Sequence, residues 1–365
     1  MSGGDRAAGA GKAAILQAAG AAARYSPRDS APLAPQPDVS ALPLTLAIGD
    51  YDHVRDLALG AVRPEGIELN VLDLPVEEIF FRFTRHREWD VSEMSFAKVV
   101  SLLSQDDRSI VPLPVFVSRV FRLSSIYVRR DGPVKAPADL RGKRLGVPEW
   151  AQTAAIYSRG YIAHELGLPL ASIEWVQAGV SEPGRVEKVA LKLPPDLRLR
   201  PAPDKTLNGM LLAGELDAAL SARPLPAFAE GKVVRLYPEY RAAEEAWYRK
   251  TGIFPIMHLV ALRRDVFERD PWVAMNLVKA FEEAKRRSLV RLGDITASHA
   301  PLAWLGDHVA RMRELFGDDP FPYGVEANRR TLDAFLQYAF EQGVCHRLLD
   351  AEQLFPEQVG SRFRI

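Results

Sequence analysis

The sequence has little cysteine, no charge imbalance and no long apolar run, and each shortage excludes a class of protein. Cys345 is the single cysteine among 365 residues, so no disulfide can form within one chain and nothing indicates an oxidising compartment. Lys plus Arg and Asp plus Glu both number 47, which leaves no net charge for binding nucleic acid or an anionic membrane. No apolar run approaches the roughly 20 residues of a membrane-spanning helix. We therefore expect neither nucleic acid nor membrane as a partner.

The N-terminal segment, residues 1–41, reads as a disordered tail rich in glycine, alanine, proline and serine. An export signal is the alternative, because Lys12 precedes a short alanine-rich run. Gln17 and Gly20 interrupt that run, and alanine makes a weak hydrophobic region. We therefore expect a cytoplasmic protein.

Several motifs of catalysis and binding are missing. The chain has no GxGxxG, no P-loop and no GxSxG, which argues against nucleotide binding and serine acyl chemistry. It has no HxxH or HExxH spacing either. His53, Glu93 and His258 could in principle form a His/His/carboxylate set, but they lie far apart in sequence, so we expect no metal. Cys345 lies in a pattern that ends one helix, and we do not expect it to be a nucleophile.

From residue 42 onward, strand-like and helix-like segments alternate. "LPLTLAIG" and "IELNVLDL" are apolar runs with β-branched residues, and "PVEEIFFRFTRH" has proline at a helix start, acidic residues in its first turn and basic residues in its last. Amphipathic helices are predicted over 153–167, 270–289 and 325–343. Strands separated by helices predict an α/β protein with mostly parallel sheets. The length, 365 residues, is enough for two domains.

Two sets of motifs carry a resemblance. "PADLRGKRLGVP", followed by a helix that opens with threonine, resembles the start of the second lobe in type II periplasmic-binding-protein folds. A narrower set resembles the 4,5-dihydroxyphthalate decarboxylase family over roughly residues 44–356. That set comprises "DVSEMSF", "FVSRVFRLSSIYVRRD", "TAAIYSRGYIAHELG", "YRKTGIFPIMHLVALR" and "FPYGVEANRRTL...AFEQGV". One position departs from the family pattern "SR.FRH": Leu123 stands in place of the histidine.

The resemblance implies a two-lobed type II periplasmic-binding-protein-like fold, each lobe a mixed, mostly parallel sheet flanked by helices. Domain 1 would be discontinuous, 42–127 and 254–365, with domain 2 inserted as 128–253 and the ligand cleft between the lobes. The segment "FPIMHLV" would return from domain 2 to domain 1 along the floor of the cleft. Pro255 would set the backbone at its start, and His258 would lie within reach of a ligand.

The resemblance also implies a carboxy-lyase. Its reaction would be the non-oxidative, cofactor-independent decarboxylation of a hydroxylated aromatic acid, 4,5-dihydroxyphthalate or a related ring, in phthalate catabolism. Two alternatives stay open: a solute-binding protein of an ABC-type importer for an aromatic or other carboxylate, and a biosynthetic enzyme of the same fold acting on a related ring. The expected partner is a small aromatic carboxylate, and the sequence is compatible with a homo-oligomer.

Such a reaction needs groups that hold carboxylates. The guanidinium fork of arginine matches a carboxylate, which makes Arg119, Arg122 and Arg159 candidates. The alternative is a solvated charge at a strand end for Arg119 and Arg122, and a surface salt bridge for Arg159. Thr153 is placed to cap a helix whose first amides could receive an anion. Turns that follow strands line the ligand crevice of α/β sheets. The polar residues in such turns are Tyr51, His53, Ser92, Glu93 and Ser95.

The reaction also needs an acid and a base. We expect His258 and Glu93 to face one another across the ligand, with His53 as the reserve. Burial among Met94 and Phe96 would raise the pKa of Glu93 and keep it protonated for delivery to the ring. Which of the two is acid and which is base stays open. The structural alternatives are a hydrogen-bonded core histidine and a carboxylate paired with arginine.

Overall fold

The structure is a computed structural model that describes residues 41–360. The expected disordered tail covers residues 1–41 and contains the alternative export signal. Of these residues, 1–40 lie outside the described part of the chain. Between residues 41 and 360, no helix combines the length and the apolar character needed to cross a bilayer.

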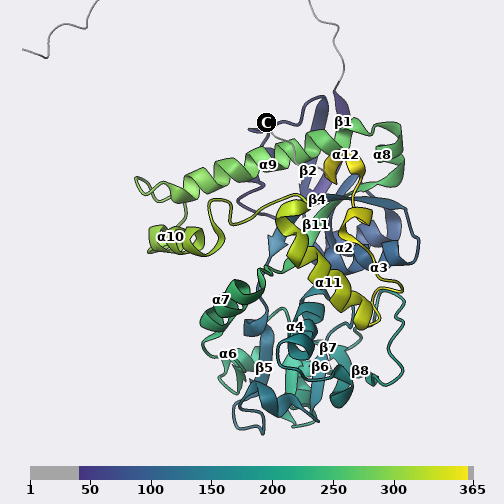
Figure 1. Ribbon diagram of the computed structural model, residues 1–365, viewed down its shortest axis with the longest axis vertical. Coiled ribbons are helices and arrows are strands. Elements are labelled where there is room, and N and C mark those ends of the chain that lie inside the picture. Colours follow the sequence, from purple (N-terminus) through teal and green to yellow (C-terminus); the bar gives the residue numbers. More distant parts are fainter. Residues whose placement is uncertain (1–40, 361–365) are drawn as a thin grey trace, which may run out of the picture. The chain divides into compact units, whose positions relative to one another are not determined.

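The first sheet has the strand order β2-β1-β3-β11-β4. Figure 1 labels β1, β2, β4 and β11 of this sheet. Its strands are β1 (Leu42–Ile48), β2 (Ile67–Asp73), β3 (Val91–Ser95), β4 (Ile110–Arg119) and β11 (Ile256–Arg263). β1 runs parallel to β2 and β3, whereas β11 runs antiparallel to both β3 and β4. The strand that the sequence indicated around "FPIMHLV" is therefore an interior strand of this sheet.

β3 shows why an interior strand positions polar side chains so firmly. All five of its residues are buried, because β1 and β11 flank it on both edges. Successive side chains of a strand point to opposite faces, so Glu93 and Ser95 share one face while Ser92 points to the other. In the register with β11, His258 pairs with Ser95. Residues far apart in sequence thus meet at the end of β3.

The second sheet has the order β10-β5-β9-β6-β7-β8. Its strands are β5 (Ile126–Arg129), β6 (Arg144–Val147), β7 (Glu174–Gly179), β8 (Leu199–Thr206), β9 (Ala218–Leu220) and β10 (Val233–Arg235). β9, β6, β7 and β8 are parallel neighbours, and β5 is antiparallel to both β9 and β10. Both sheets are therefore mixed, as expected. The second has a parallel majority, whereas the first has two parallel and two antiparallel strand pairings.

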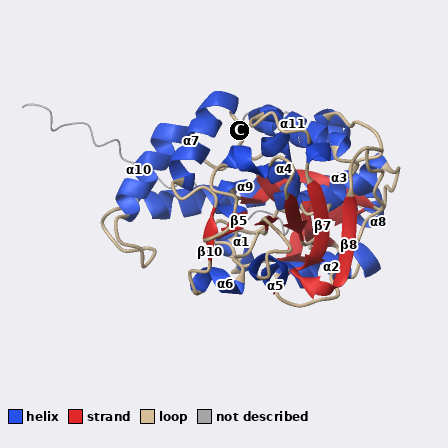
Figure 2. Ribbon diagram, turned by 90° about the horizontal axis from the view of Figure 1, so that it is seen from below, coloured by secondary structure: helices blue, strands red, loops and turns tan. Residues whose placement is uncertain are grey.

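Helices cover both faces of the strands (Figure 2). The α-helices are α1 (Arg55–Ala58), α2 (Val76–His86), α3 (Phe96–Ser104), α4 (Thr153–His164), α5 (Leu207–Leu212), α6 (Pro226–Ala229), α7 (Tyr240–Thr251), α8 (Arg264–Arg269), α9 (Trp272–Gly293), α10 (Leu305–Phe316), α11 (Arg329–Glu341) and α12 (Glu357–Gly360). Short 3₁₀ turns span Leu123–Ser125, Pro137–Leu140, Leu170–Ser172, Glu326–Asn328 and Ala351–Gln353. The helices predicted over 153–167, 270–289 and 325–343 are confirmed as α4, α9 and α11, but α4 is buried on most sides and is not amphipathic.

The chain passes from the first sheet to the second between Arg119 and Ile126, and returns between Arg235 and Ile256. The second sheet thus takes its strands from one continuous stretch, and the first sheet takes its strands from both sides of it. We propose domain limits close to 127/128 and 253/254; the first of these falls within β5 (Ile126–Arg129), all of which belongs to the second sheet. The strand predicted at "SSIYVRR" is β5, which starts the second sheet.

Helix α11 packs directly against α4, and Gly160 of α4 allows this close approach. A Cβ at Gly160 would lie 2.3 Å from Cδ2 of Tyr338, which no side chain can tolerate without a shift. At the end of α11, Gln342 accepts hydrogen bonds from Trp150 Nε1 at 2.7 Å and from Arg159 Nε at 2.7 Å. The C-terminal part of the chain therefore fixes the position of α4.

Candidate functional site

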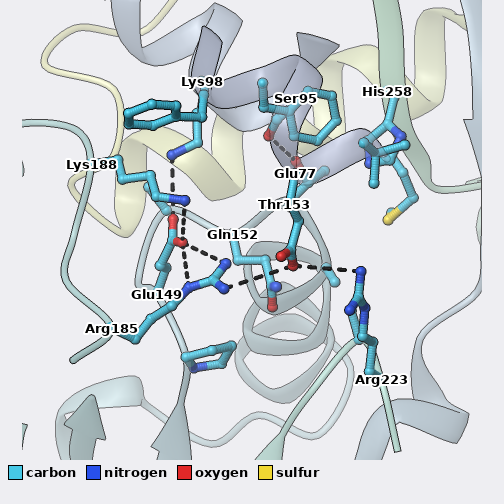
Figure 3. Close-up of a pocket in the computed structure, with 18 of the residues that line it drawn as sticks. Glu77, Ser95, Lys98, Glu149, Gln152, Thr153, Arg185, Lys188, Arg223 and His258 are labelled. Carbon is cyan, nitrogen blue, oxygen red and sulfur yellow. Dashed lines mark hydrogen bonds and ion pairs between the residues drawn. The ribbon is translucent and has the colours of Figure 1, made fainter. Parts of the chain in front are cut away.

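A cavity of about 590 Å³ lies between elements of the first sheet and elements of the second. The first sheet's side contributes side chains from α2, the β3–α3 junction and β11. The second sheet's side contributes the segments 148–154, 180–188 and 221–223. Figure 3 shows the polar lining residues converging from both sides. The volume and mixed lining suit a small-molecule ligand.

The lining carries more positive than negative charge. Its basic residues are Arg85, Lys98, Arg122, Arg185, Lys188 and Arg223. Its acidic residues are Glu77, Glu149 and Glu187. Phe80 and Phe81 of α2 add aromatic surface. A cavity with an aromatic wall and excess cations is suited to a flat ligand that carries more than one carboxylate.

The floor of the cavity joins β3 to α4. Ser95 Oγ lies 3.0 Å from Thr153 Oγ1, which also accepts a hydrogen bond from the Ala97 amide at 3.1 Å. The expectation that Thr153 caps α4 is wrong: Gln152 is the N-cap, and Thr153 is the first helical residue. The Thr153 hydroxyl instead contacts Ser95 Oγ and the Ala97 amide across the floor of the cavity.

The first turn of α4 nevertheless offers amides to the cavity. The Ile156 amide is the one that donates to the Gln152 carbonyl, so the amides of Thr153 and Ala154 precede the helical ladder. Both residues line the cavity. Free amides at a helix N-terminus bind anions through hydrogen bonds and the helix dipole.

His258 and Glu93 are in direct contact. The His258 Nδ1–H donates to Glu93 Oε1 at 2.6 Å, and the His258 ring lines the cavity while the Glu93 side chain does not. Phe80 meets the imidazole edge-on, with ring centroids 4.8 Å apart. The expectation that a ligand lies between His258 and Glu93 is therefore wrong, because the two side chains leave no space between them.

Glu93 is 0% exposed, and both of its carboxylate oxygens are engaged. Besides His258, the Tyr51 hydroxyl donates to Oε1 at 2.6 Å and the Gly49 amide donates to Oε2 at 2.9 Å. Burial would raise the pKa of Glu93, but the hydrogen bonds from His258, Tyr51 and Gly49 outweigh it and lower the pKa below the ordinary value. The expectation of a protonated Glu93 is wrong for this reason. Glu93 is an anion that holds the Nδ1 proton of His258.

A cluster of three cations surrounds one carboxylate on the opposite wall. Glu149 contacts Lys98 Nζ at 3.3 Å, Arg185 at 2.7 Å and Lys188 Nζ at 3.2 Å (Figure 3). The side chain of Glu149 is 3% exposed and that of Lys98 is 7% exposed. We call Lys98, Glu149, Arg185 and Lys188 the Glu149 cluster. Its cations exceed its single anion, so the cluster attracts a further negative charge.

Glu77 of α2 reaches from the first sheet's side to two arginines of the other side. It lies 3.7 Å from Arg185 and 3.7 Å from Arg223. Arg122, which lies between β4 and β5, directs its Nε toward Met257 Sδ at 3.2 Å and lines the cavity. Burial lowers the pKa of Arg122 to about 10, which Glu244 opposes.

Two of the predicted carboxylate-binding arginines do not reach the cavity. Arg119 is buried and donates to the carbonyls of Phe254 and Pro322 and to Asn328 Oδ1. Arg159 is 0% exposed; it donates to Gln342 and to the Trp150 carbonyl and stacks 3.7 Å from the Trp150 ring. Neither lines the cavity. The structure matches neither alternative, because both arginines are buried and donate to uncharged oxygens.

Three other candidates also lie outside the lining. The His53 Nε2–H donates to the Val117 carbonyl at 3.0 Å, and burial lowers the pKa of His53 to about 4. Ser92 is buried on the opposite face of β3, where it accepts from Trp89 Nε1 at 2.9 Å. Tyr51 lies behind His258 and contacts Glu93. Of the predicted residues, the cavity is lined by Ser95, Arg122, Thr153 and His258.

The sequence interpretation missed the Glu149 cluster. A signal was present at one of its members: Lys98 is a lysine within the otherwise apolar helix "FAKVVSLLS". A charged residue on the apolar face of a buried helix needs a partner. Glu149 and Arg185 carry no comparable signal, because each lies in a loop.

Among residues 41–360, no three His, Cys, Asp or Glu side chains gather in a way that could hold a metal ion. His53, Glu93 and His258 in particular do not form such a group.

Comparison with known proteins places the chain in a family. No family model matches it. It is 36% identical over 330 residues to the 4,5-dihydroxyphthalate decarboxylase of Comamonas testosteroni, which covers 90% of this chain and 100% of the relative. It is 40% identical over 211 residues to the 4,5-dihydroxyphthalate decarboxylase of Pseudomonas putida, which covers 57% of this chain and 82% of the relative.

Among solved structures, the periplasmic aliphatic sulphonate binding protein SsuA of Escherichia coli matches with a TM-score of 0.50 and 11% identity, over 87% of this chain and 98% of that chain. The expected two-lobed periplasmic-binding-protein-like α/β fold is confirmed. The identity to the Comamonas testosteroni enzyme extends over that enzyme's whole length. The chain belongs to the 4,5-dihydroxyphthalate decarboxylase family.

Proposed function

We propose that this protein is a carboxy-lyase that decarboxylates 4,5-dihydroxyphthalate or a closely related hydroxylated aromatic acid in the cavity described above. The observation that carries the proposal is the 36% identity to a curated 4,5-dihydroxyphthalate decarboxylase over 100% of that enzyme. The protein would then act in the catabolism of phthalates.

The cavity supports this proposal because its lining matches such a substrate. The amides of Thr153 and Ala154 and the side chain of Arg122 are placed to hold carboxylates. Phe80 offers an edge or face to the aromatic ring. The excess of basic residues suits a dianion better than a neutral ligand.

His258 is the group best placed to accept a proton from a ring hydroxyl. With Nδ1–H held by the ionised Glu93, the other nitrogen of this cavity-lining residue, Nε2, is left as an acceptor. Removing the phenolic proton pushes electron density into the ring, which is what loss of CO2 requires. Glu93 and Tyr51 act behind His258 as positioning residues.

The test is CO2 release from a panel of hydroxylated phthalates and benzoates. We expect turnover of rings with a hydroxyl ortho or para to a carboxylate, and binding without turnover of unsubstituted phthalate. His258→Gln should lower kcat by roughly 10²–10⁴-fold, as expected when a positioned base is lost. Tight binding of every aromatic acid with no CO2 from any would contradict the proposal and favour the alternative, a binding protein of an importer.

The proposal includes no metal or organic cofactor, because the phenol itself serves as electron source. Dialysis of the enzyme against EDTA should leave kcat unchanged. A loss of activity that Mg²⁺, Mn²⁺ or Zn²⁺ restores would contradict this part.

We further propose that the partner is the small aromatic carboxylate alone and that the protein acts in the cytoplasm. Support comes from the single cysteine, which permits no disulfide within the chain. Antibody detection in separated cytoplasmic and periplasmic fractions checks the compartment. Recovery in the periplasm would contradict it.

A further inference from the structure

The proposed reaction needs two proton-transfer groups, and the pair of Glu93 and His258 supplies one. A base must take the phenolic proton, and an acid must protonate the ring carbon that loses CO2. Glu93 cannot be that acid, because it is ionised, 0% exposed and absent from the cavity lining. A second group must therefore come from the cavity wall or from water.

Lys98 is the cavity-lining group that fits this need. The lining arginines are poor proton donors near neutral pH, since even the lowered pKa of Arg122 is about 10. Glu149 is held as an anion, since the neighbouring Lys98 and Arg185 oppose the effect of its burial and its pKa is lowered. The side chain of Lys188 is 38% exposed, whereas that of Lys98 is 7% exposed. Of the two lysines that line the cavity, Lys98 is thus the buried one.

The geometry sets Lys98 opposite His258. Lys98 lies in the first turn of α3, three residues after Ser95, and Ser95 pairs with His258 in the sheet register. Lys98 and His258 flank the contact between Ser95 and Thr153 on its two sides (Figure 3). An ammonium has three N–H donors, and among the described residues Glu149 accepts one of them. The others are available to a ligand in the cavity.

The surroundings of Lys98 favour release of its proton. Burial lowers the pKa of Lys98 below its ordinary value, and the Lys188 ammonium acts in the same direction. The carboxylates of Glu149 and Glu187 oppose this shift. Arg185 and Lys188 share Glu149 with Lys98, which weakens the hold of that carboxylate on the Lys98 ammonium.

We propose that Lys98 is a catalytic acid whose ammonium protonates the ring carbon that carries the departing carboxylate, with Glu149 holding it in position. This inference rests on the proposed decarboxylation. His258 Nε2 takes the phenolic proton, and the oxygen electron pair moves into the ring. The ring carbon forms a C–H bond with a proton of Lys98. The C–C bond then breaks, its electron pair restores the aromatic ring, and CO2 leaves.

The numbers of protons released and taken up balance when Lys98 takes one proton from solvent. The product phenolate recovers its proton from His258, so His258 returns to its starting state. Lys98 ends neutral and takes a proton from water, so each turnover consumes one proton. The rate should therefore fall as the pH rises through the pKa of Lys98 in the substrate complex.

The first test is the substitution of Lys98→Arg, which keeps the positive charge but removes a transferable proton. We expect kcat to fall by roughly 10²–10⁴-fold while KM changes by no more than a few fold. The alkaline fall of kcat that we expect for the parent should be absent from Lys98→Arg. If Lys98→Arg keeps the parent's kcat and pH profile, the inference is overturned and Lys98 acts through its charge alone.

The second test covers the case in which the arginine side chain of Lys98→Arg is too large for the space that Lys98 occupies. In Lys98→Ala, small primary amines should restore turnover, with a rate that depends on the pKa of the amine. Guanidinium, which has the same charge and no transferable proton, should not restore it. Equal rescue by amine and guanidinium overturns the inference while CO2 release by the parent upholds the proposed function. A parent that releases no CO2 from any substrate overturns both.

Discussion

Glu93 illustrates how a few hydrogen bonds decide the state of a single residue. Its carboxylate is fully buried, a position that would ordinarily favour the protonated form. Three donors, His258 Nδ1, Tyr51 Oη and Gly49 N, reverse that preference. The residue that the sequence indicated as an acid is thus an anchor for a base.

Replacing Glu93 with glutamine should test this role. Glu93→Gln keeps the shape but removes the charge, so the Nδ1–H of His258 loses its ionic acceptor. We expect kcat to fall by roughly 10²–10⁴-fold while phthalate affinity stays within a few fold. The downfield proton resonance of the His258 Nδ1–H should also disappear, a signature that a purely structural role would not explain.

Tyr51→Phe is the matched control, because it removes one donor from Glu93 and leaves the contact with His258. It should lower kcat less than Glu93→Gln does and keep the downfield resonance. If Glu93→Gln turned over at the parent's rate with that resonance unchanged, Glu93 would not position His258.

His53 predicts a pH dependence of stability. Its pKa is about 4 in the folded protein, below the ordinary value of 6.5, because burial disfavours the charged ring. Between pH 6.5 and 4 the unfolded chain therefore binds a proton that the folded protein does not. The free energy of unfolding should fall as the pH is lowered through this window, by roughly 2–3 kcal/mol from His53 alone.

Urea denaturation at several pH values in this window measures the effect, with His53→Gln as the comparison. The parent should lose more stability on acidification than the variant. Parallel curves for the two proteins would mean that His53 does not titrate abnormally.

The sequence identified four of the fifteen polar residues that line the cavity, and strand geometry explains part of the division. Alternation along β3 already separates Glu93 and Ser95 from Ser92, so Ser92 could have been excluded from the sequence alone. Arg119 and Arg159 could not. Each is buried by partners near the C-terminal end of the chain, Asn328 and Gln342, whose positions no local pattern reveals.

At the scale of elements, helix α4 contributes both to the cavity and to the packing of the core. Its first turn faces the cavity, and its interior residue Arg159 is locked to the end of α11. Arg159→Met should leave the acceptors on Gln342 and Trp150 without a donor, which costs about 1–3 kcal/mol of unfolding free energy. Substrate KM should not change, because Arg159 does not line the cavity.

Arg122→Met is the matched comparison, since Arg122 does line the cavity. It should weaken phthalate binding by about 1.5–3 kcal/mol, the range for a hydrogen bond to a charged group. Denaturation curves and calorimetric titration of both variants separate stability from affinity. An altered affinity in Arg159→Met with unaltered stability would reverse the two assignments.

Some elements escaped prediction for identifiable reasons. β8 carries Pro201 and Pro203, which argue against a strand, but β8 is the edge of its sheet, where a missing N–H costs little. Helix α10 has no buried residue, so no apolar face in contact with a core marks it. The long helices α9 and α11 were predictable because their apolar faces are long and regular.

At the scale of the molecule, the cavity takes its lining from the elements of both sheets, so a bound dianion should stabilise the whole fold. Phthalate, which lacks the hydroxyls needed for turnover, is the suitable probe. At one hundred times its Kd it should add about 2.7 kcal/mol to the unfolding free energy. Benzoate, with one carboxylate, should raise the melting temperature less at equal concentration.

Added salt provides the control for this prediction, because screening weakens the attraction of the basic lining for a dianion. The shift caused by phthalate should shrink as NaCl is raised. Equal shifts for phthalate and benzoate at every salt concentration would show that the excess of basic residues does not select a dianion.

The position of β11 in the first sheet has a consequence for biosynthesis. The second sheet draws all its strands from residues 126–235, so it can be completed while the chain is still being made. The first sheet cannot, since β11 lies between β3 and β4 and is synthesised last of its five strands. Until Arg263 has left the ribosome, β3 lacks a neighbouring strand on one edge, and Glu93 lacks its hydrogen bond from His258. The inserted part of the chain is therefore ready first, and the pair that would take the substrate's proton forms only near the end of translation.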